Sequence, residues 1–397
     1  MFRGSVSATS RLFADIRKRC FSEHTNRGQN LDGLDAYTLR GTHDLKDIVQ
    51  EHDGQVIAKY IEVLLAVKAQ AELRVNKMNV LIIGRGVVGT IYGWALATAG
   101  IHVTHVVRKK GLPSTETLDL LDLRTGYPKH TRANYTPKTV RTISPSDGFD
   151  LVIVATKHYQ AVQAIQQYLA DAPGATILLF TANWDGTEDI DRILARSTAL
   201  WGYAKASGGV DARGILVATV DPAVRLGMLK GSDPDRFKAV AELFQSAGFN
   251  LDVKPNIIEW LWVHHAINAG GIGVCLWAGG IAEATRSLAT LRLGVWAVRD
   301  ALGVLAARGV NPGIYPEARS VLNTPTWLAA LAGAYSVRFT EKGRRLLRAS
   351  HFANSAEEMK RFYFDVLNTG ESLGVAMPHL AALRGRIESY PAKKRRA

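Results

Sequence analysis

Short apolar runs alternate with helical patterns through the middle of the chain. The first run, residues 79–83, ends at a glycine, as a buried parallel strand often does. A helical pattern from Ile91 to Ala99 follows and stops at Gly100, a residue suited to a helix end. Further strands are expected at His102–Val107, Leu151–Ala155, Ile177–Phe180, Ile215–Val220 and Phe249–Val253, with a helix at 158–169. This alternation predicts a parallel sheet with right-handed crossovers.

After about Pro255 the pattern becomes helical. Long helical stretches are expected at Asn256–Trp277, Ala284–Arg308, Trp327–Tyr335 and Ala356–Leu373. The fold class is therefore α/β, with an N-terminal Rossmann dinucleotide-binding domain at 78–254 and an all-helical C-terminal domain at 255–390 that binds substrate. Residues 391–397 form a basic tail.

Residues 1–77 differ from the rest and are expected to be an extension, partly disordered or helical. Up to about residue 30 the extension is rich in Arg and Ser and has no hydrophobic period, as in a mitochondrial presequence. Without such a presequence we expect the protein in the cytoplasm. From about 54 to 77 apolar residues recur at helical spacing. Either Met78 is the true start of the chain, or the extension is a small helical appendage.

Composition narrows the class of protein further. The chain has 397 residues, 47% hydrophobic and 21% charged, as in a globular protein with a large core. No run reaches the roughly 18 apolar residues of a membrane span, so no membrane partner is expected. Cys20 and Cys275 match no metal spacing and indicate a reducing compartment. The net charge of +13 is spread out, without a nucleic-acid motif, and favours an anionic cofactor and a small anionic substrate.

A glycine-rich turn follows the first strand. Gly84, Gly86 and Gly89, with Val87 and Val88 between the last two, form the pattern G-x-G-x-x-G between a strand and a helix. The first glycine permits the tight turn, the second lets the backbone approach a pyrophosphate, and the third lets helix and strand pack closely. The helix N-terminus then offers unpaired N–H groups to the phosphates. The turn therefore predicts a bound dinucleotide.

The end of the second strand distinguishes between the two nicotinamide cofactors. An acidic residue there would bind the ribose 2′-hydroxyl of NAD, but this chain has Arg108, Lys109 and Lys110. Cationic donors suit the 2′-phosphate instead, so NADP is the expected cofactor.

From about Met78 to Tyr390 the chain resembles the ketopantoate reductases (2-dehydropantoate 2-reductases). Four segments carry the resemblance: 79–108; 150–157, ending at Lys157; 180–186, containing Asn183; and 358–378, beginning at Glu358. The resemblance implies a Rossmann domain, a helical domain like that of 6-phosphogluconate dehydrogenase, and reduction of a 2-oxo acid by NADPH. It also implies cofactor contacts at Lys157 and Asn183 and a catalytic role for Glu358.

The first helix after the boundary departs from the family pattern, which has a lysine followed by asparagines four and eight positions later. Trp260, His264 and Asn268 share this spacing and one helix face, but only Asn268 matches. A register two residues later puts Trp262 at the lysine, so neither register keeps it. His264 is then the candidate proton donor, because imidazole titrates near neutral pH. Trp260 and Asn268 would contact the substrate.

The expected function is NADPH-dependent reduction of a small 2-oxo acid or a related carbonyl compound. Hydride transfer builds negative charge on the carbonyl oxygen, so the site must stabilise that charge and supply a proton. Two alternatives remain: an imine-reducing dehydrogenase of the opine type, and a non-catalytic NADP-binding sensor. A homodimer is left open, and no metal is expected.

Overall fold

A computed structural model of the 397-residue chain describes residues 78–108, 111–348 and 356–391. The predictions for the extension 1–77, for Lys109 and Lys110, and for the last six residues of the basic tail lie outside the described residues. Among the described residues, no helix is long and apolar enough to cross a membrane.

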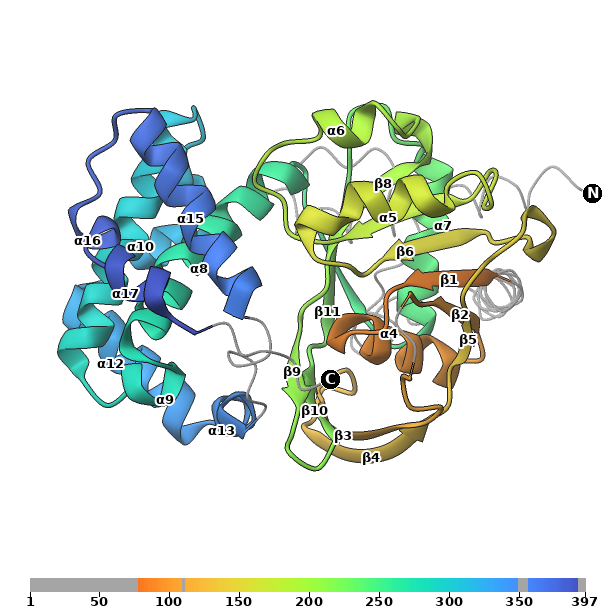
Figure 1. Ribbon diagram of the computed structural model, residues 1–397, viewed down its shortest axis with the longest axis horizontal. Helices are drawn as coiled ribbons and strands as arrows, with labels where there is room; N and C mark the ends of the chain where they lie inside the picture. Colours follow the sequence, from red (N-terminus) through yellow and green to blue (C-terminus); the bar gives the residue numbers. More distant parts are fainter. Residues whose placement is uncertain (1–77, 109–110, 349–355, 392–397) are drawn as a thin grey trace, which may run out of the picture. The chain divides into compact units, whose positions relative to one another are not determined.

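An eight-stranded sheet lies at the centre of the dinucleotide-binding domain, in the order β12-β11-β8-β7-β6-β1-β2-β5 (Figure 1). Its strands are β1 (Asn79–Ile83), β2 (His102–Val106), β5 (Lys138–Val140), β6 (Leu151–Val154), β7 (Thr176–Phe180), β8 (Ala199–Tyr203), β11 (Ala223–Met228) and β12 (Asn250–Val253). The helices of this part of the chain are α4 (Val87–Thr98), α5 (Ala161–Tyr168), α6 (Glu188–Asp191) and α7 (Pro234–Ser246). The Rossmann prediction is confirmed.

The sheet is not wholly parallel, which corrects the sequence-based expectation. Neighbouring strands from β5 through β2, β1, β6 and β7 to β8 are parallel, but β11 runs antiparallel to β8. The cause is the path of the chain. After β8 the chain forms strands of a second sheet and returns to the first sheet through the short link Asp221–Pro222. It therefore enters the main sheet from the opposite end.

That second sheet has four strands, in the order β4-β3-β10-β9. They are β3 (Glu116–Asp122), β4 (Lys129–Tyr135), β9 (Ala206–Val210) and β10 (Leu216–Val220). The run at 215–220 is thus a strand, as expected, but it pairs with β3 and β9 and not with the Rossmann strands. Its apolar residues Leu216, Ala218 and Val220 are buried against the same core as β1, which explains why its pattern is that of a core strand.

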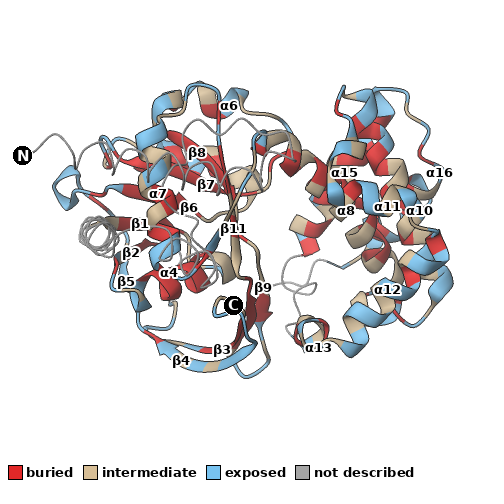
Figure 2. Cartoon of the chain, turned by 180° about the vertical axis from the view of Figure 1, so that it is seen from behind, coloured by how far each residue is buried: buried red, intermediate tan, exposed pale blue. Residues whose placement is uncertain are grey.

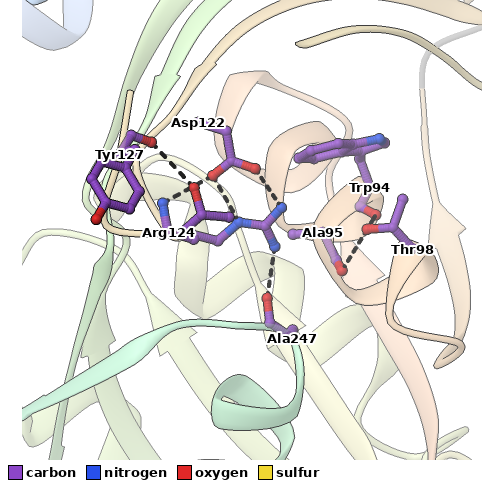
Figure 3. A network of polar contacts seen from close by, with 8 residues as sticks. Trp94, Ala95, Thr98, Asp122, Arg124, Tyr127 and Ala247 are labelled. Carbon is purple, nitrogen blue, oxygen red and sulfur yellow. Dashed lines mark hydrogen bonds and ion pairs between the residues drawn. The ribbon is translucent and has the colours of Figure 1, made fainter. Parts of the chain in front are cut away.

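One arginine ties the second sheet to the helices of the first (Figure 3). Arg124 donates from Nε and Nη2 to the Asp122 carboxylate at 3.0 and 2.8 Å, and from Nη1 to the Ala247 carbonyl at 2.7 Å. Its guanidinium also lies 5.0 Å from the ring centroid of Trp94 on α4. Burial works to raise the pKa of Asp122, but the hydrogen bonds from Arg124 outweigh it and the pKa is lowered. The pair therefore stays ionised and fixes the turn after β3.

The remainder of the described chain is helical. Its helices are α8 (Ile257–Ala278), α9 (Ile281–Ala284), α10 (Leu288–Ala307), α11 (Pro316–Asn323), α12 (Thr326–Phe339), α13 (Glu341–Arg348), α15 (Ala356–Ser372), α16 (Pro378–Ala381) and α17 (Arg384–Ser389). Asn256 caps α8, because its side-chain oxygen accepts a hydrogen bond from the Glu259 N–H at 3.1 Å. β12 ends at Val253 and α8 begins at Ile257, and we keep residue 254 as the proposed boundary.

Buried positions follow the central strands and the inner faces of α8, α10 and α15 (Figure 2). α8 and α10 pack very closely at Gly270, where an added Cβ would lie 2.4 Å from the Val298 backbone nitrogen. Only a glycine fits this crossing. The packing fixes the rotation of α8, and so determines which of its side chains face the strand ends of the Rossmann sheet.

Candidate active site

The glycine turn is built as a dinucleotide site requires. Gly84 has a φ of 108°, and a Cβ there would lie 2.9 Å from the Ala155 carbonyl oxygen. A Cβ at Gly89 would lie 2.5 Å from the Gly84 carbonyl oxygen, so helix and turn pack directly. At Gly86 a Cβ would meet nothing within 4 Å, which leaves the face open to a phosphate.

The N-terminus of α4 points its free donors at this open face. The first hydrogen bond within the helix is Thr90 N–H to the Gly86 carbonyl, at 2.9 Å, so the N–H groups of Val87, Val88 and Gly89 have no partner within the helix. No acidic residue lies in the first turn of α4 to repel an anion. The residues present therefore fit a pyrophosphate.

Arg108 follows β2 and is exposed at this edge of the sheet. One of its guanidinium nitrogens lies 3.4 Å from the side-chain oxygen of Gln163, and this long hydrogen bond leaves the other donors of the guanidinium available. A 2′-phosphate would find a cation here and no carboxylate on the two residues before it, Val106 and Val107.

Lys157 and Glu358 meet where the Rossmann sheet faces the helical part of the chain. Lys157 follows β6, Glu358 lies in the first turn of α15, and Lys157 Nζ is 3.7 Å from Glu358 Oε2. Both side chains are about one-quarter exposed, at 27% and 25%. Each residue was identified from the sequence independently of the other, and the structure places their side chains together. They present a cation and a carboxylate to a ligand bound beside the strand ends.

The side chain of Asn183 makes contacts within the protein, whereas the resemblance implied a contact with the cofactor. Its side-chain oxygen accepts hydrogen bonds from Gly186 N–H at 3.1 Å and from Trp262 Nε1 at 2.9 Å, and its Nδ2 donates to the Gly186 carbonyl at 2.5 Å. Only 6% of the residue is exposed. The side chain therefore holds its own turn and α8 in place, and any contact of this turn with a cofactor falls to the backbone.

Trp260 does not line an open site, which corrects its expected role in substrate binding. The residue is 2% exposed, and its Nε1 donates to Glu317 Oε1 at 3.2 Å. The Arg225 guanidinium covers its ring, 4.5 Å from the centroid. A substrate cannot reach this indole while those neighbours stay in place. The structure thus puts an arginine from the sheet beside the position where the family has a lysine.

His264 lies one turn further along α8, stacked on Trp260 with 5.2 Å between ring centroids. Its Nε2 is 2.7 Å from the hydroxyl oxygen of Tyr203, the last residue of β8. Burial lowers the pKa of His264 to about 3, and the nearby side chains of Arg225, His265 and Lys205 lower it further. The imidazole is neutral at pH 7, so it does not act there as the protonated donor that the sequence suggested.

Asn268 follows on the same face of α8 and is partly exposed. The alternative register of the family pattern, through Trp262, Ala266 and Gly270, lies on a different face of α8. Ala266 and Gly270 are buried, and Gly270 faces α10. Of the two faces, the one with His264 and Asn268 is the one that borders Tyr203.

A buried cluster supports the strand end behind Lys157. His158 and His265 each place Nε2 3.3 Å from the same Asp365 oxygen, Oδ2. Burial would raise the pKa of Asp365, but the two neighbouring histidine side chains lower it to about 2. His265 is fully buried, and burial lowers its pKa. Because Asp365 lies two turns after Glu358 on α15, the cluster orients the helix that carries Glu358.

Three residues of this site were not identified from the sequence: Tyr203, Arg225 and Asp365. Tyr203 and Arg225 lie on β8 and β11, which were not predicted as strands. The apolar run at 199–201 is the signal that could have revealed β8. Asp365 carries no motif, and only the fold brings it to the two histidines.

The fold is a Rossmann sheet with a glycine turn, followed by a helical region that contacts the carboxyl ends of the strands. This arrangement is typical of nicotinamide-dependent oxidoreductases. Residues 80–231 match the family model described as ketopantoate reductase PanE/ApbA. This part of the chain is therefore similar to the ketopantoate reductase family.

Individual relatives are distant. A 2-dehydropantoate 2-reductase of Pyrococcus abyssi is 26% identical over 201 residues, which are 48% of this chain and 61% of the relative. The chain thus spans about 61% of the length of that curated relative. The structure of a 2-dehydropantoate 2-reductase from Geobacter metallireducens superposes with a TM-score of 0.59 at 16% identity, over 79% of this chain and 100% of the other. D-mandelate dehydrogenase with NADH and anilino(oxo)acetate gives 0.59 at 15%, over 79% and 98%. These two structures show the shared fold.

Proposed function

We propose that the protein is an NADPH-dependent reductase of a small 2-oxo acid or a related carbonyl compound. The observation that carries the proposal is the arrangement at the carboxyl edge of the parallel strands. There the open glycine turn follows β1, Lys157 follows β6 and pairs with Glu358 of α15, and Tyr203 ends β8 and contacts His264 of α8. Ligands of open α/β sheets bind at this edge. The match to the ketopantoate reductase family model and the likeness to the D-mandelate dehydrogenase complex agree with this class of reaction.

Each group has a task in the proposed reaction. NADPH supplies a hydride when bound, with its pyrophosphate at the N-terminus of α4 and its 2′-phosphate at Arg108. Lys157 stabilises negative charge on the substrate, and Glu358 holds the lysine in position. Asn268, which is partly exposed on α8, orients the substrate. A small anionic substrate suits a chain with a net charge of +13. That the protein forms a homodimer remains a prediction.

Oxidation of NADPH with a panel of 2-oxo acids tests the proposal. We expect saturable turnover with at least one of them in the absence of amines, and a higher kcat/KM with NADPH than with NADH. Turnover only when an amine is added would point to imine reduction. Tight NADPH binding with no turnover on any compound would favour the sensor and contradict the proposal.

A further inference from the structure

A tyrosine–histidine pair lies at the carboxyl end of β8, between the Rossmann sheet and α8. The Tyr203 hydroxyl oxygen and His264 Nε2 are 2.7 Å apart, a short and well-formed hydrogen bond. The two rings also contact edge to face, with 4.5 Å between centroids. Because β8 runs parallel to β7, Tyr203 lies at the same sheet edge as the residues that follow β1 and β6.

The surroundings of the pair fix its geometry and its charge. Trp260 stacks on His264 with an interplanar angle of 14° and packs 5.5 Å from the Tyr203 ring, so neither ring can rotate freely. Arg225, opposite Tyr203 in the β8–β11 register, places a guanidinium over the far face of Trp260. Lys205 lies two residues after Tyr203, and its Nζ is 3.3 Å from Asp221 Oδ2. Among the described residues, the anionic group that affects Tyr203 is Glu358, which is paired with Lys157.

The ionisation states follow from these contacts. Burial raises the pKa of Tyr203 to about 12; the charge of Arg225 acts to lower it and that of Glu358 to raise it. His264 is neutral at pH 7, since burial and the charges of Arg225 and Lys205 lower its pKa. A neutral imidazole can donate its Nε2 hydrogen to the tyrosyl oxygen, which leaves the tyrosyl proton free to point at a ligand.

We propose that the Tyr203 hydroxyl is the proton donor of the reaction and that His264 is a positioning residue that acts through it. The inference rests on the proposed function, since it assigns the proton in the same reduction. A reduced dinucleotide bound at the glycine turn would supply the hydride that the carbonyl carbon takes up, and would thereby be oxidised. The carbonyl oxygen takes the π-electron pair and the Tyr203 proton, and becomes a hydroxyl. The tyrosyl O–H bond breaks, the resulting phenolate accepts the hydrogen bond from His264 Nε2, and water later returns the proton.

The electrostatic surroundings suit a transient phenolate. The guanidinium of Arg225 disfavours a charged His264 but favours a negative oxygen on Tyr203, and the ammonium of Lys205 also disfavours a charged His264. In this arrangement the positive charge and the proton, which a lysine would supply together, come from different side chains. The site can therefore work without a lysine on α8, whose 22 residues contain none.

Three variants test the inference: Tyr203→Phe, His264→Ala and, as the matched control, Tyr168→Phe. The control removes a tyrosyl hydroxyl from α5 that accepts a hydrogen bond only from its neighbour Gln167. We expect Tyr203→Phe to lower kcat by roughly 10²–10⁴-fold, the usual contribution of a general acid. His264→Ala should lower it less, and Tyr168→Phe should leave it unchanged. NADPH should bind all three variants as tightly as it binds the natural protein, which also shows that they fold.

Binding of oxamate, a stable isostere of a 2-oxo acid, gives a readout that needs no turnover. Quenching of bound NADPH fluorescence should show about tenfold weaker oxamate binding to Tyr203→Phe and unchanged binding to Tyr168→Phe. The pH dependence separates the two partners: kcat should be flat from about pH 6 to 9 if Tyr203 gives the proton, since its pKa lies above this range. A limb near neutrality that His264→Ala removes would make His264 the donor.

A fully active Tyr203→Phe variant with unchanged oxamate binding would overturn the inference and leave the proposed function intact. No turnover by the natural protein on any 2-oxo acid would overturn both.

Discussion

Individual side chains divide the tasks of the site among several elements. Trp260 fills the position that the resemblance gives to a lysine, and the cation beside it is Arg225, with its guanidinium 4.5 Å from the ring centroid. Arg225 is itself held by Asp252, at 2.9 Å from Nε to Oδ2. Its charge is therefore fixed in place and acts on His264 and Tyr203 through space.

Arg108 is the residue that should decide cofactor preference. Replacing it by alanine removes the charged donor for the 2′-phosphate, so NADPH affinity should fall by about 1.5–3 kcal/mol while NADH affinity stays the same. Titration of both cofactors by fluorescence measures the two affinities.

Arg141→Ala is the matched control, because this arginine is also exposed but lies beyond β5. Both variants remove one positive charge, so a general effect of net charge would appear in both. An unchanged NADPH to NADH ratio in Arg108→Ala would show that another group binds the 2′-phosphate.

Residue types could be predicted from sequence only where a motif or a resemblance marked them. The glycines of the turn have a local reason for being glycine, and the structure shows that reason at Gly84 and Gly89. His264 was identified through its spacing, but its neutral state depends on burial and on the charges of Arg225, on β11, and Lys205, which follows β8. A sequence pattern carries no information on such a through-space neighbour.

Among the elements, α8 has the greatest influence on the site. One face packs on α10, another carries His264 and Asn268, and Trp262 reaches Asn183 in the turn after β7. The rotation of α8 is set at Gly270, since no side chain fits between it and Val298. A shift of this helix would move His264 away from Tyr203.

Gly270→Ala should therefore destabilise the protein. The new methyl group would lie 2.4 Å from the Val298 nitrogen, and overpacking of this kind typically costs about 1–3 kcal/mol. The free energy of unfolding in urea measures the change.

Gly271→Ala is the control, because a Cβ at this neighbouring position meets nothing within 4 Å. Alanine favours the helix over glycine by up to about 1 kcal/mol, so this variant should be as stable as the natural protein or more so. Equal stability of the two variants would mean that the α8–α10 crossing can relax.

Elements with a continuous apolar or helical pattern could be predicted from the sequence, and elements whose pattern is interrupted could not. α8 and α15 were expected at nearly their observed bounds, as were β1 and β6. β8 was missed although its first four residues are buried, because the run is short and contains a glycine. β3 and β4 were missed because charged and polar residues interrupt them.

At the scale of the whole molecule, sheet topology explains where the sequence-based picture was incomplete. The excursion of the chain through β9 and β10 turns β11 around, and this antiparallel strand is what places Arg225 opposite Tyr203. Pairing of β3 with β10 joins segments about one hundred residues apart in the chain. Such long-range pairing depends on the competition between strands for partners, which local patterns do not reveal.

The central claim is that the open glycine turn and the groups following β6 and β8 together carry out a hydride transfer. NADPH labelled with deuterium at the transferable position of the nicotinamide tests this most directly. Mass spectrometry of the product from an accepted 2-oxo acid should find one deuterium on carbon 2 of the resulting 2-hydroxy acid. Oxidation of NADPH without label on that carbon, or recovery of the 2-oxo acid unchanged, would contradict it.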